Sequence, residues 1–378
     1  MKKTRFILLT VLAALAMFIV FEKTSGRAFS LGSNPPKNIY FLKAVISLIR
    51  NDYLEEKDPA QTIEGSFKGL VNSLDSYSGY LNAESTARYL SQKDAPIKET
   101  GTVLFKRYGG FPQVIGLTPN SPAEKQGLQF GDLITEIDGR ATPAMSLAEV
   151  NLYLRGSEEK PVELKVLRGE KTIEVRLERT LLFPEPFLFK SQEGTAGVLQ
   201  VARLAPPLVD TLQTKILSDL QKAKNTLIID LRNCQEGTFE EAREFINLFL
   251  QAESLGYFEK RGETKEVLSS PGEPRLAKLP LIVWINQATL GPAEAVAAVL
   301  KEFKRAKVVG LPTLGMAAWR EFFPLEDGTS VILTTGIFCL NSGVKLWGQG
   351  AAPDVELEIE NQSFETFLQK TQPLLSSS

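Results

Sequence analysis

The chain has 378 residues, of which 43% are hydrophobic and 23% are charged, and its formal net charge is −2. This length predicts two or three domains, and the near-neutral charge gives no electrostatic support for nucleic-acid binding. The absence of histidine excludes Ser-His-Asp and Cys-His catalysis and metal sites with histidine ligands. Hydrolytic chemistry would therefore need lysine, a carboxylate or threonine, and neither a metal nor another cofactor is predicted.

Residues 1–30 have the pattern of a targeting segment. Three basic residues precede an apolar run over residues 6–21, and Glu22 and Lys23 end it. This order is typical of a secretory signal, with a buried core helix as the structural alternative. No clear small-residue cleavage site follows, and about sixteen apolar residues barely span a bilayer, so a cleaved signal peptide and an uncleaved signal anchor both stay open. Either one predicts an exported protein of the cell envelope, periplasmic or otherwise extracytoplasmic.

Residues 35–96 are predicted to form an N-terminal helical region. Residues 39–54 place apolar side chains on one helical face. A second helix is predicted over residues 58–75, with Asp58 as its N-cap and Pro59 at its first position. Two short amphipathic helices bury little apolar surface alone, so we expect this region to dock on a larger body.

Residues 97–182 change to short strands and turns, which predicts a β-rich domain. Ser121 opens a short helix that Gly127 ends. An amphipathic helix is predicted over residues 146–156, followed by a hairpin that turns around Arg168-Gly169.

Residues 183–378 alternate strands and helices, the mark of an α/β layer. An antiparallel pair that turns at Asp327-Gly328 follows near the end. We therefore expect a mixed sheet with flanking helices. The predicted strands are 196–204, 225–233, 280–285 and 306–312, and the predicted helices are 208–223, 238–250 and 292–303.

The stretch "QVIGLTPNSPAEKQGLQFGDLITEIDGR" over residues 113–140 resembles the core of a PDZ domain. In that family a peptide adds as a strand beside the second strand and the following helix, with its carboxylate in a loop of backbone N–H groups. Val103 stands where a second glycine is common in this loop, which predicts weak capture of a free carboxylate. A spacer or lid without ligand is the alternative. The resemblance implies peptide-binding residues Gly101, Thr102, Val103, Leu104 and Phe105 on the strand and Val150 and Leu154 on the helix.

The chain as a whole resembles the carboxyl-terminal processing peptidases, also called tail-specific proteases. "SLDSYSGYL" is similar to that family's "SLDPHSSYL", "IIDLRNCQEG" to "DLRNNPGG", and "KRAKVVGLPTLG" to "xRAxVVGxxTFGKG". "PLEDGTSVILTTG" and "GQGAAPDVEL" are similar to its closing motifs. The resemblance implies an α/β protease core of the ClpP/crotonase type with an inserted PDZ domain.

That family uses a Ser-Lys dyad, with the serine in "SASASE" and the lysine after "TFG". Alignment without gaps places Gly291 at the serine position and Met316 at the lysine position. A neutral lysine must take the serine proton in this chemistry. Both reactive groups are therefore absent in this reading.

Neighbouring positions depart from the family pattern as well. Residues 234–237 read "CQEG" in place of "NPGG", so Glu236 brings a carboxylate where an oxyanion would need donors, and Gly237 is retained. Glu302 and Arg320 stand at the positions of two helper residues. Gly291 and Pro292 are explained as a helix start, and proline is expected to bias Gly291 toward an extended N-cap conformation.

Three functional hypotheses follow. The first is a catalytically inactive homologue, a pseudoprotease, that binds protein or peptide segments through the PDZ groove as adaptor, scaffold or regulator. The second is an active peptidase with a relocated nucleophile, for which Thr289, Thr313 and Cys234 are candidates, although each has a simpler structural role. The third is a structural envelope component whose groove is unused.

Partners follow from the first hypothesis. The groove would take protein or peptide segments, and an active protease or another envelope protein would be regulated. A homo-oligomer also stays open, and nucleic acid is not expected. The two cysteines, Cys234 and Cys339, leave one disulfide or none as alternatives.

Overall fold

The structure is a computed structural model that divides the chain after Glu64 into two compact units. The targeting segment predicted over residues 1–30 lies outside the described residues. Within the described part, no helix combines the length and the apolar character needed to cross a membrane. The structure describes residues 37–55, 58–93, 98–157, 160–183, 185–223, 225–263, 265–358 and 363–375.

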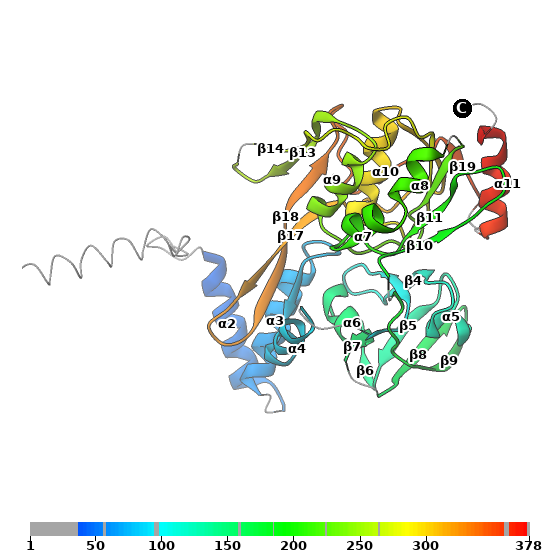
Figure 1. Ribbon diagram of the computed structural model, residues 1–378. Coiled ribbons are helices and arrows are strands. Elements are labelled where there is room, and N and C mark those ends of the chain that lie inside the picture. Colours follow the sequence, from blue (N-terminus) through cyan, green and yellow to red (C-terminus); the bar gives the residue numbers. More distant parts are fainter. Residues whose placement is uncertain are drawn as a thin grey trace, which may run out of the picture. The chain divides into compact units, whose positions relative to one another are not determined.

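The first unit contains helix α2 (Lys37–Asp52) and the beginning of helix α3 (Pro59–Asn72) (Figure 1). Both helices were predicted, and Pro59 is the first residue of α3, where its missing N–H has no intrahelical partner. Large apolar side chains of α2 are exposed, with Tyr40 at 64% and Phe41 at 75%. Docking of these helices on a larger body stays a prediction.

The second unit contains a β-rich region between residues 98 and 180. Its sheet has the order β3-β4-β5-β8-β9, with β6 beside β5, and a separate short pair joins β2 and β7. Ser121 caps helix α5 and the hairpin turns at Gly169, as predicted. The helix predicted over residues 146–156 is shorter: Ser146 is the N-cap of α6, which ends at Leu154, and Arg155 and Gly156 form β7. The elements are β2 (Lys98–Glu99), β3 (Thr102–Phe105), β4 (Gln113–Leu117), α5 (Pro122–Lys125), β5 (Leu133–Ile137), β6 (Arg140–Ala141), α6 (Leu147–Leu154), β7 (Arg155–Gly156), β8 (Val162–Arg168) and β9 (Lys171–Leu177).

The rest of the second unit, from residue 185 onward, is called the core here. Its main sheet is parallel except for one antiparallel edge strand, β10. Parallel strands require helical crossovers, which is why strands and helices alternate along this part of the sequence. In spatial order the strands are β10 (Phe187–Lys190), β11 (Gly197–Val201), β12 (Leu227–Asp230), β15 (Leu281–Ile285), β16 (Ala306–Gly310) and β19 (Val355–Glu356).

Helices flank both faces of this sheet (Figure 1). Successive strand residues point to opposite faces, so Ile229 belongs to the apolar cluster of helices α9 and α10, while Ile228 packs with Trp284 and Phe367 of α11. The expected mixed sheet with flanking helices is confirmed. The helices are α7 (Leu208–Lys215), α8 (Leu217–Lys222), α9 (Phe239–Asn247), α10 (Pro292–Glu302) and α11 (Phe364–Leu375).

The single helix predicted over residues 208–223 is wrong in one respect. The helix is interrupted at Ile216, whose φ of −132° lies outside the helical range, so the segment forms two shorter helices, α7 and α8. Leu212 before the break and Leu217 after it are five positions apart, about 140° around a continuous helix, yet both are buried. Packing thus overrides a continuous helical pattern.

A second sheet is built around the long strand β18, which pairs with three other strands (Figure 1). Strands β1 and β13 pair with one edge of β18 and β17 with the other, and β14 pairs with β13. Among the described strands, β17 pairs only with β18. The antiparallel pair predicted around Asp327-Gly328 is confirmed as β17 and β18. The elements are β1 (Gly79–Leu81), α4 (Ala83–Lys93), β13 (Ala252–Lys260), β14 (Glu266–Ser270), β17 (Ala318–Pro324) and β18 (Ser330–Cys339).

The β-rich region packs directly on the core. At Gly116 of β4, an added Cβ atom would lie 2.4 Å from Asn233 Oδ1 and 2.5 Å from the Ala288 Cβ atom. Only glycine allows so close an approach. Asn233 follows β12 and Ala288 follows β15, so the β-rich region contacts the core at the carboxyl ends of neighbouring parallel strands.

Candidate functional site

Hydrogen bonds of a buried side chain hold the turn between β15 and α10 in place. The fully buried Thr289 hydroxyl donates to the Leu231 carbonyl at 2.8 Å and accepts from the Asn286 N–H at 3.0 Å. Gly291 then has φ +62° and ψ −123°. The expected extended conformation at Gly291 is therefore wrong: the turn directs the chain through a region that only glycine adopts at low cost.

Glu294 joins this turn to loop 313–316. Its carboxylate is fully buried and accepts hydrogen bonds from the N–H groups of Gly291, Gly315 and Met316 at 2.6 to 2.9 Å. The Thr313 hydroxyl donates to the same carboxylate at 2.5 Å. Burial raises the pKa of Glu294 to about 7, although all four donors act to lower it.

Gly291 and Met316 line one pocket of about 480 Å³. A Cβ atom added to Gly291 would lie 3.8 Å from the Met316 carbonyl oxygen, so the two positions are adjacent. The structure thus brings the two predicted dyad positions together. The pocket lies between the core and helices α4 and α6, and its wall includes Tyr77, Tyr89, Gln235, Gly237, Phe239, Trp319, Arg320 and Phe322.

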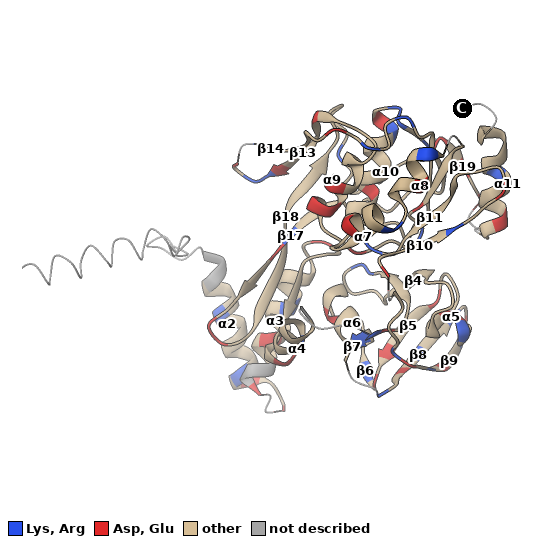
Figure 2. Ribbon diagram, viewed as in Figure 1, with Lys and Arg blue, Asp and Glu red and all other residues tan. Residues whose placement is uncertain are grey.

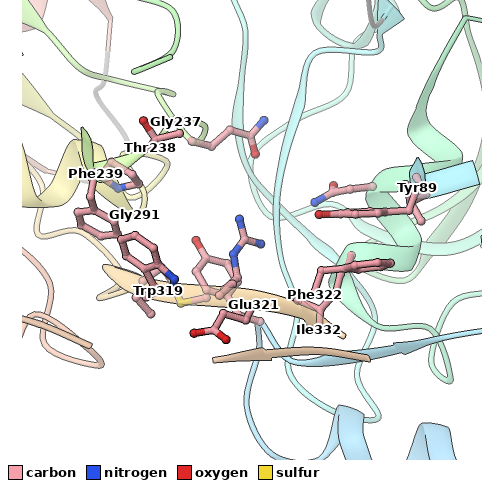
Figure 3. A pocket seen from close by; sticks show the side chains of 18 of the residues that line it. Tyr89, Gly237, Thr238, Phe239, Gly291, Trp319, Glu321, Phe322 and Ile332 are labelled. Atoms are coloured by element: carbon pink, nitrogen blue, oxygen red, sulfur yellow. The ribbon is translucent and has the colours of Figure 1, made fainter. Parts of the chain in front are cut away.

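Two aromatic pairs form opposite parts of this pocket (Figure 3). Phe239 stacks on Trp319 with 6.4 Å between ring centroids, and Tyr89 stacks on Phe322 at 4.8 Å. None of these aromatic residues was predicted from the sequence, because they come from three separate elements, α4, α9 and β17, and share no motif. Aromatic side chains give the pocket a rigid apolar lining.

Tyr77 and Arg320 meet in the same pocket. The Arg320 guanidinium lies 4.5 Å from the centre of the Tyr77 ring, a distance suited to a cation–π contact. Burial raises the pKa of Tyr77, with Arg320 acting in the opposite direction, so the phenol is neutral near pH 7. Arg320 was a predicted site residue. Tyr77 was missed, although it lies within the family-like motif "SLDSYSGYL".

The three candidate relocated nucleophiles do not line the pocket. Thr289 is bound within its turn, and Thr313 donates to Glu294 and accepts from the Ala351 N–H at 2.8 Å. Cys234 is fully buried, and burial raises the pKa of its thiol to about 12. Cys234 and Cys339 are both free, buried thiols.

Glu302 is not brought to the site. It ends α10, about 16 Å from Gly291 at 1.5 Å per residue, and accepts hydrogen bonds from the N–H groups of Asn341 and Ser342. Its role here is to anchor the turn after β18.

Loop 234–237 faces the β-rich region as well as the pocket. Gly237 lines the pocket, and an added Cβ atom there would lie 2.3 Å from the Leu204 carbonyl oxygen, which requires glycine. Glu236 forms an ion pair with Arg155 and does not line the pocket. Glu236 was expected to oppose an oxyanion, but its charge is balanced by Arg155, which itself lines the pocket.

The predicted peptide-binding residues lie together but are closed off. Val103, Leu104, Val150 and Leu154 are at most 2% exposed and belong to one apolar cluster. That cluster continues into the core through Ala288, Leu290 and Met316. Phe105 is half-buried and lines a different pocket, next to Leu314. Gly101 is required by close packing, because an added Cβ atom would lie 2.1 Å from the Ser121 side chain.

Comparison with known proteins agrees with this arrangement. Residues 196–357 match the model of Peptidase family S41, and residues 113–168 match that of a PDZ domain. A probable CtpA-like serine protease of Staphylococcus aureus (strain COL) is 25% identical over 353 residues, which cover 92% of this chain and 70% of the relative.

A second relative and a solved structure extend the match. The carboxy-terminal processing protease CtpA of Bacillus subtilis (strain 168) is 26% identical over 358 residues, 92% of this chain and 75% of the relative. The photosystem II D1 C-terminal processing protease shares the fold, with a TM-score of 0.69, 22% identity and coverage of 89% of this chain and 91% of that one. The chain thus carries a Peptidase family S41 region and a PDZ domain, and over nearly its whole length it is similar to carboxyl-terminal processing peptidases.

Proposed function

We propose that this protein does not cleave peptides but binds protein or peptide segments, as an adaptor, scaffold or regulator in the cell envelope. One observation carries the proposal. The pocket is retained, while the two adjacent positions that the motifs assign to the dyad hold Gly291 and Met316. Acyl transfer needs a nucleophile beside a base, and glycine and methionine supply neither.

The other pocket residues do not replace the missing pair. The residues that line the pocket in the described part of the chain include no lysine and no cysteine. The Thr238 hydroxyl accepts the Glu241 N–H at 3.1 Å as the N-cap of α9. Tyr77 is a neutral phenol at physiological pH, beside a cation rather than a base.

The pocket suits an extended apolar segment. Five consecutive residues of β17, Ala318 to Phe322, line it, and β17 pairs only with β18 among the described strands. An extended peptide can add to such an edge through main-chain hydrogen bonds. The two aromatic pairs would then contact its side chains.

Localisation and partners follow from the sequence. The targeting pattern of residues 1–30 supports export to the cell envelope. Lys and Arg are interspersed with Asp and Glu over the described elements (Figure 2), which favours protein or peptide partners over nucleic acid. An active protease of the same compartment is one such partner.

The test measures cleavage and binding on the same preparation of the full chain. We expect no cleavage of unfolded or C-terminally tagged substrates above background. A labelled extended apolar peptide should bind in the micromolar range or more weakly, about −8 kcal/mol or less in magnitude. Phe322→Ala should weaken binding, and Val267→Ala, which removes an exposed apolar side chain from β14, should not.

Two results would contradict the proposal. Turnover that survives purification and disappears in Thr289→Ala or Cys234→Ala would establish a relocated nucleophile. Absence of peptide binding, with circular dichroism showing a folded chain, would favour a structural envelope component.

A further inference from the structure

The free edge of β3 is already engaged by the core. The Thr118 N–H of the neighbouring segment donates to the Gly101 carbonyl at 2.8 Å. Backbone groups of successive residues in an antiparallel ladder point to opposite edges, so the Thr102 carbonyl points away from β4. That outer edge is where a bound peptide would add. The Gln235 side-chain amide donates to the Thr102 carbonyl at 3.4 Å.

An ion pair lies next to this contact. Arg155 follows α6 directly and pairs with Glu99 across β2 and β7, and Glu99 precedes Gly101 by two residues. The Arg155 guanidinium forms ion pairs with Glu236 and, at 3.5 Å, with Glu99. The side chains are 14 to 31% exposed. A carboxylate from the core thus lies at the end of the groove where the carboxylate of a peptide would be expected.

We propose that Gln235 and Glu236 form an internal ligand that closes the carboxylate end of the PDZ groove. A peptide with a free C-terminal carboxylate opens the groove by replacing Glu236 at Arg155. The peptide part of this inference rests on the proposed function. The ligand class is therefore an extended peptide with a free terminus, and Arg155 is the residue that distinguishes a free acid from an amide.

The sequence of the loop supports this reading. Gln235 and Glu236 stand where the family motif "DLRNNPGG" has proline and glycine. Neither proline nor glycine has a side chain that donates to a carbonyl or pairs with a guanidinium. Of the three departures from the motif in this loop, the two at Gln235 and Glu236 are the ones that contact the PDZ domain.

The closure also explains why a terminal carboxylate should matter little in the unmodified chain. Glu236 occupies Arg155, so a free acid gains the Arg155 contact only by displacing Glu236, whereas an amide gains nothing at Arg155 in either case. The apparent affinity of the acid is therefore reduced by the fraction of molecules in which Arg155 is available. Removal of Glu236 raises that fraction and leaves Arg155 without its nearer carboxylate. Preference for a free acid should therefore emerge only in the variant.

The experiment compares one labelled apolar peptide as free acid and as amide, by fluorescence anisotropy with the full chain. Wild type should bind both forms within about twofold. Glu236→Ala should bind the free acid about five- to tenfold more tightly and change the amide less. Gln235→Ala should strengthen both forms equally. Glu259→Ala, which removes the Glu259–Lys345 ion pair elsewhere in the core, should change neither.

A second measurement needs no peptide. Amide hydrogen exchange along β3 should be faster in Glu236→Ala than in wild type and slow again when Arg155→Glu is combined with Glu236→Arg. Unchanged exchange and unchanged affinity would overturn the closure. An equal gain for acid and amide would overturn the competition at Arg155. Faster exchange without binding of either peptide would keep the closure, and would reject both the competition and the proposed peptide binding.

Discussion

The Glu294 carboxylate accepts a hydrogen bond from the backbone N–H of Met316 at 2.6 Å. The same carboxylate accepts the Gly291 N–H at 2.9 Å, so one buried side chain holds both proposed dyad positions in place. Backbone geometry at the site is thus maintained by a group that does not itself line the pocket. One carboxylate therefore fixes the backbone at both positions that the motifs assign to the dyad.

Stability should depend on pH through Glu294. Burial raises its folded-state pKa from the ordinary 4.5 to about 7, so folding favours the protonated form. This contribution is fully present below pH 4.5 and is lost as pH rises through 7. The free energy of unfolding should therefore fall across this window, by at most about 1.4 kcal/mol per pH unit.

Glu294→Gln provides the control, because glutamine cannot titrate. The difference between the denaturation free energies of wild type and variant, measured from pH 4.5 to 8, isolates this group from other titrations. Parallel profiles, or a wild type that gains stability relative to the variant as pH rises, would show that the four hydrogen-bond donors outweigh burial.

Restoring the dyad should not restore full activity. The pocket has space for the Gly291→Ser side chain, but φ +62° with ψ −123° strains a residue other than glycine by about 1–3 kcal/mol. Met316→Lys adds the base. Loop 234–237 still lacks its Pro-Gly pair, and loss of one oxyanion donor alone lowers rates about 10²–10³-fold. Peptide hydrolysis by the double variant should stay far below rates typical of the family.

The matched comparison adds Gln235→Pro and Glu236→Gly to the double variant. This fourfold variant should be faster than the double variant if the loop limits the rate. Equal rates for the two would mean that the loop is competent as it stands.

Packing of the PDZ domain on the core should be sensitive to Gly116. A valine there would place atoms within 2.4 Å of Asn233 and 2.5 Å of Ala288, which forces the surfaces apart and destabilises the chain by about 1–3 kcal/mol. Hydrogen exchange should rise in loop 234–237 and along β4. Gly110→Ala, whose Cβ atom would lie 3.4 Å from the Arg107 carbonyl oxygen, serves as the control. The same increase in both variants would contradict a specific contact at Gly116.

Cys234 should be unreactive in the folded chain. Its side chain is fully buried, and burial raises its thiol pKa to about 12, so both access and thiolate formation are suppressed. In a Cys339→Ser background, iodoacetamide at pH 8 should label Cys234 only after denaturant is added. Rapid labelling of the native chain would restore Cys234 as a candidate nucleophile.

Local patterns were sufficient for much of this protein. Ser121 caps a helix because its hydroxyl accepts an orphan N–H, and the hairpin at Gly169 follows from a residue that tolerates positive φ. The identities of Gly291 and Met316 at the motif positions needed only an alignment without gaps. Each of these inferences depends on interactions within a few residues or on residue identity alone.

Tertiary packing decided the rest, because it sets where a side chain points. Glu236 was expected to oppose an oxyanion, yet docking of the PDZ domain places Arg155, 81 positions earlier in the chain, beside it. Ile216 interrupts a helical pattern so that leucines on both sides are buried. Tyr77 belongs to a motif far from Arg320 in the sequence, yet both line the pocket and the Arg320 guanidinium lies against the Tyr77 ring. Contacts between segments so far apart leave no periodic signal in the sequence, so only the folded chain reveals them.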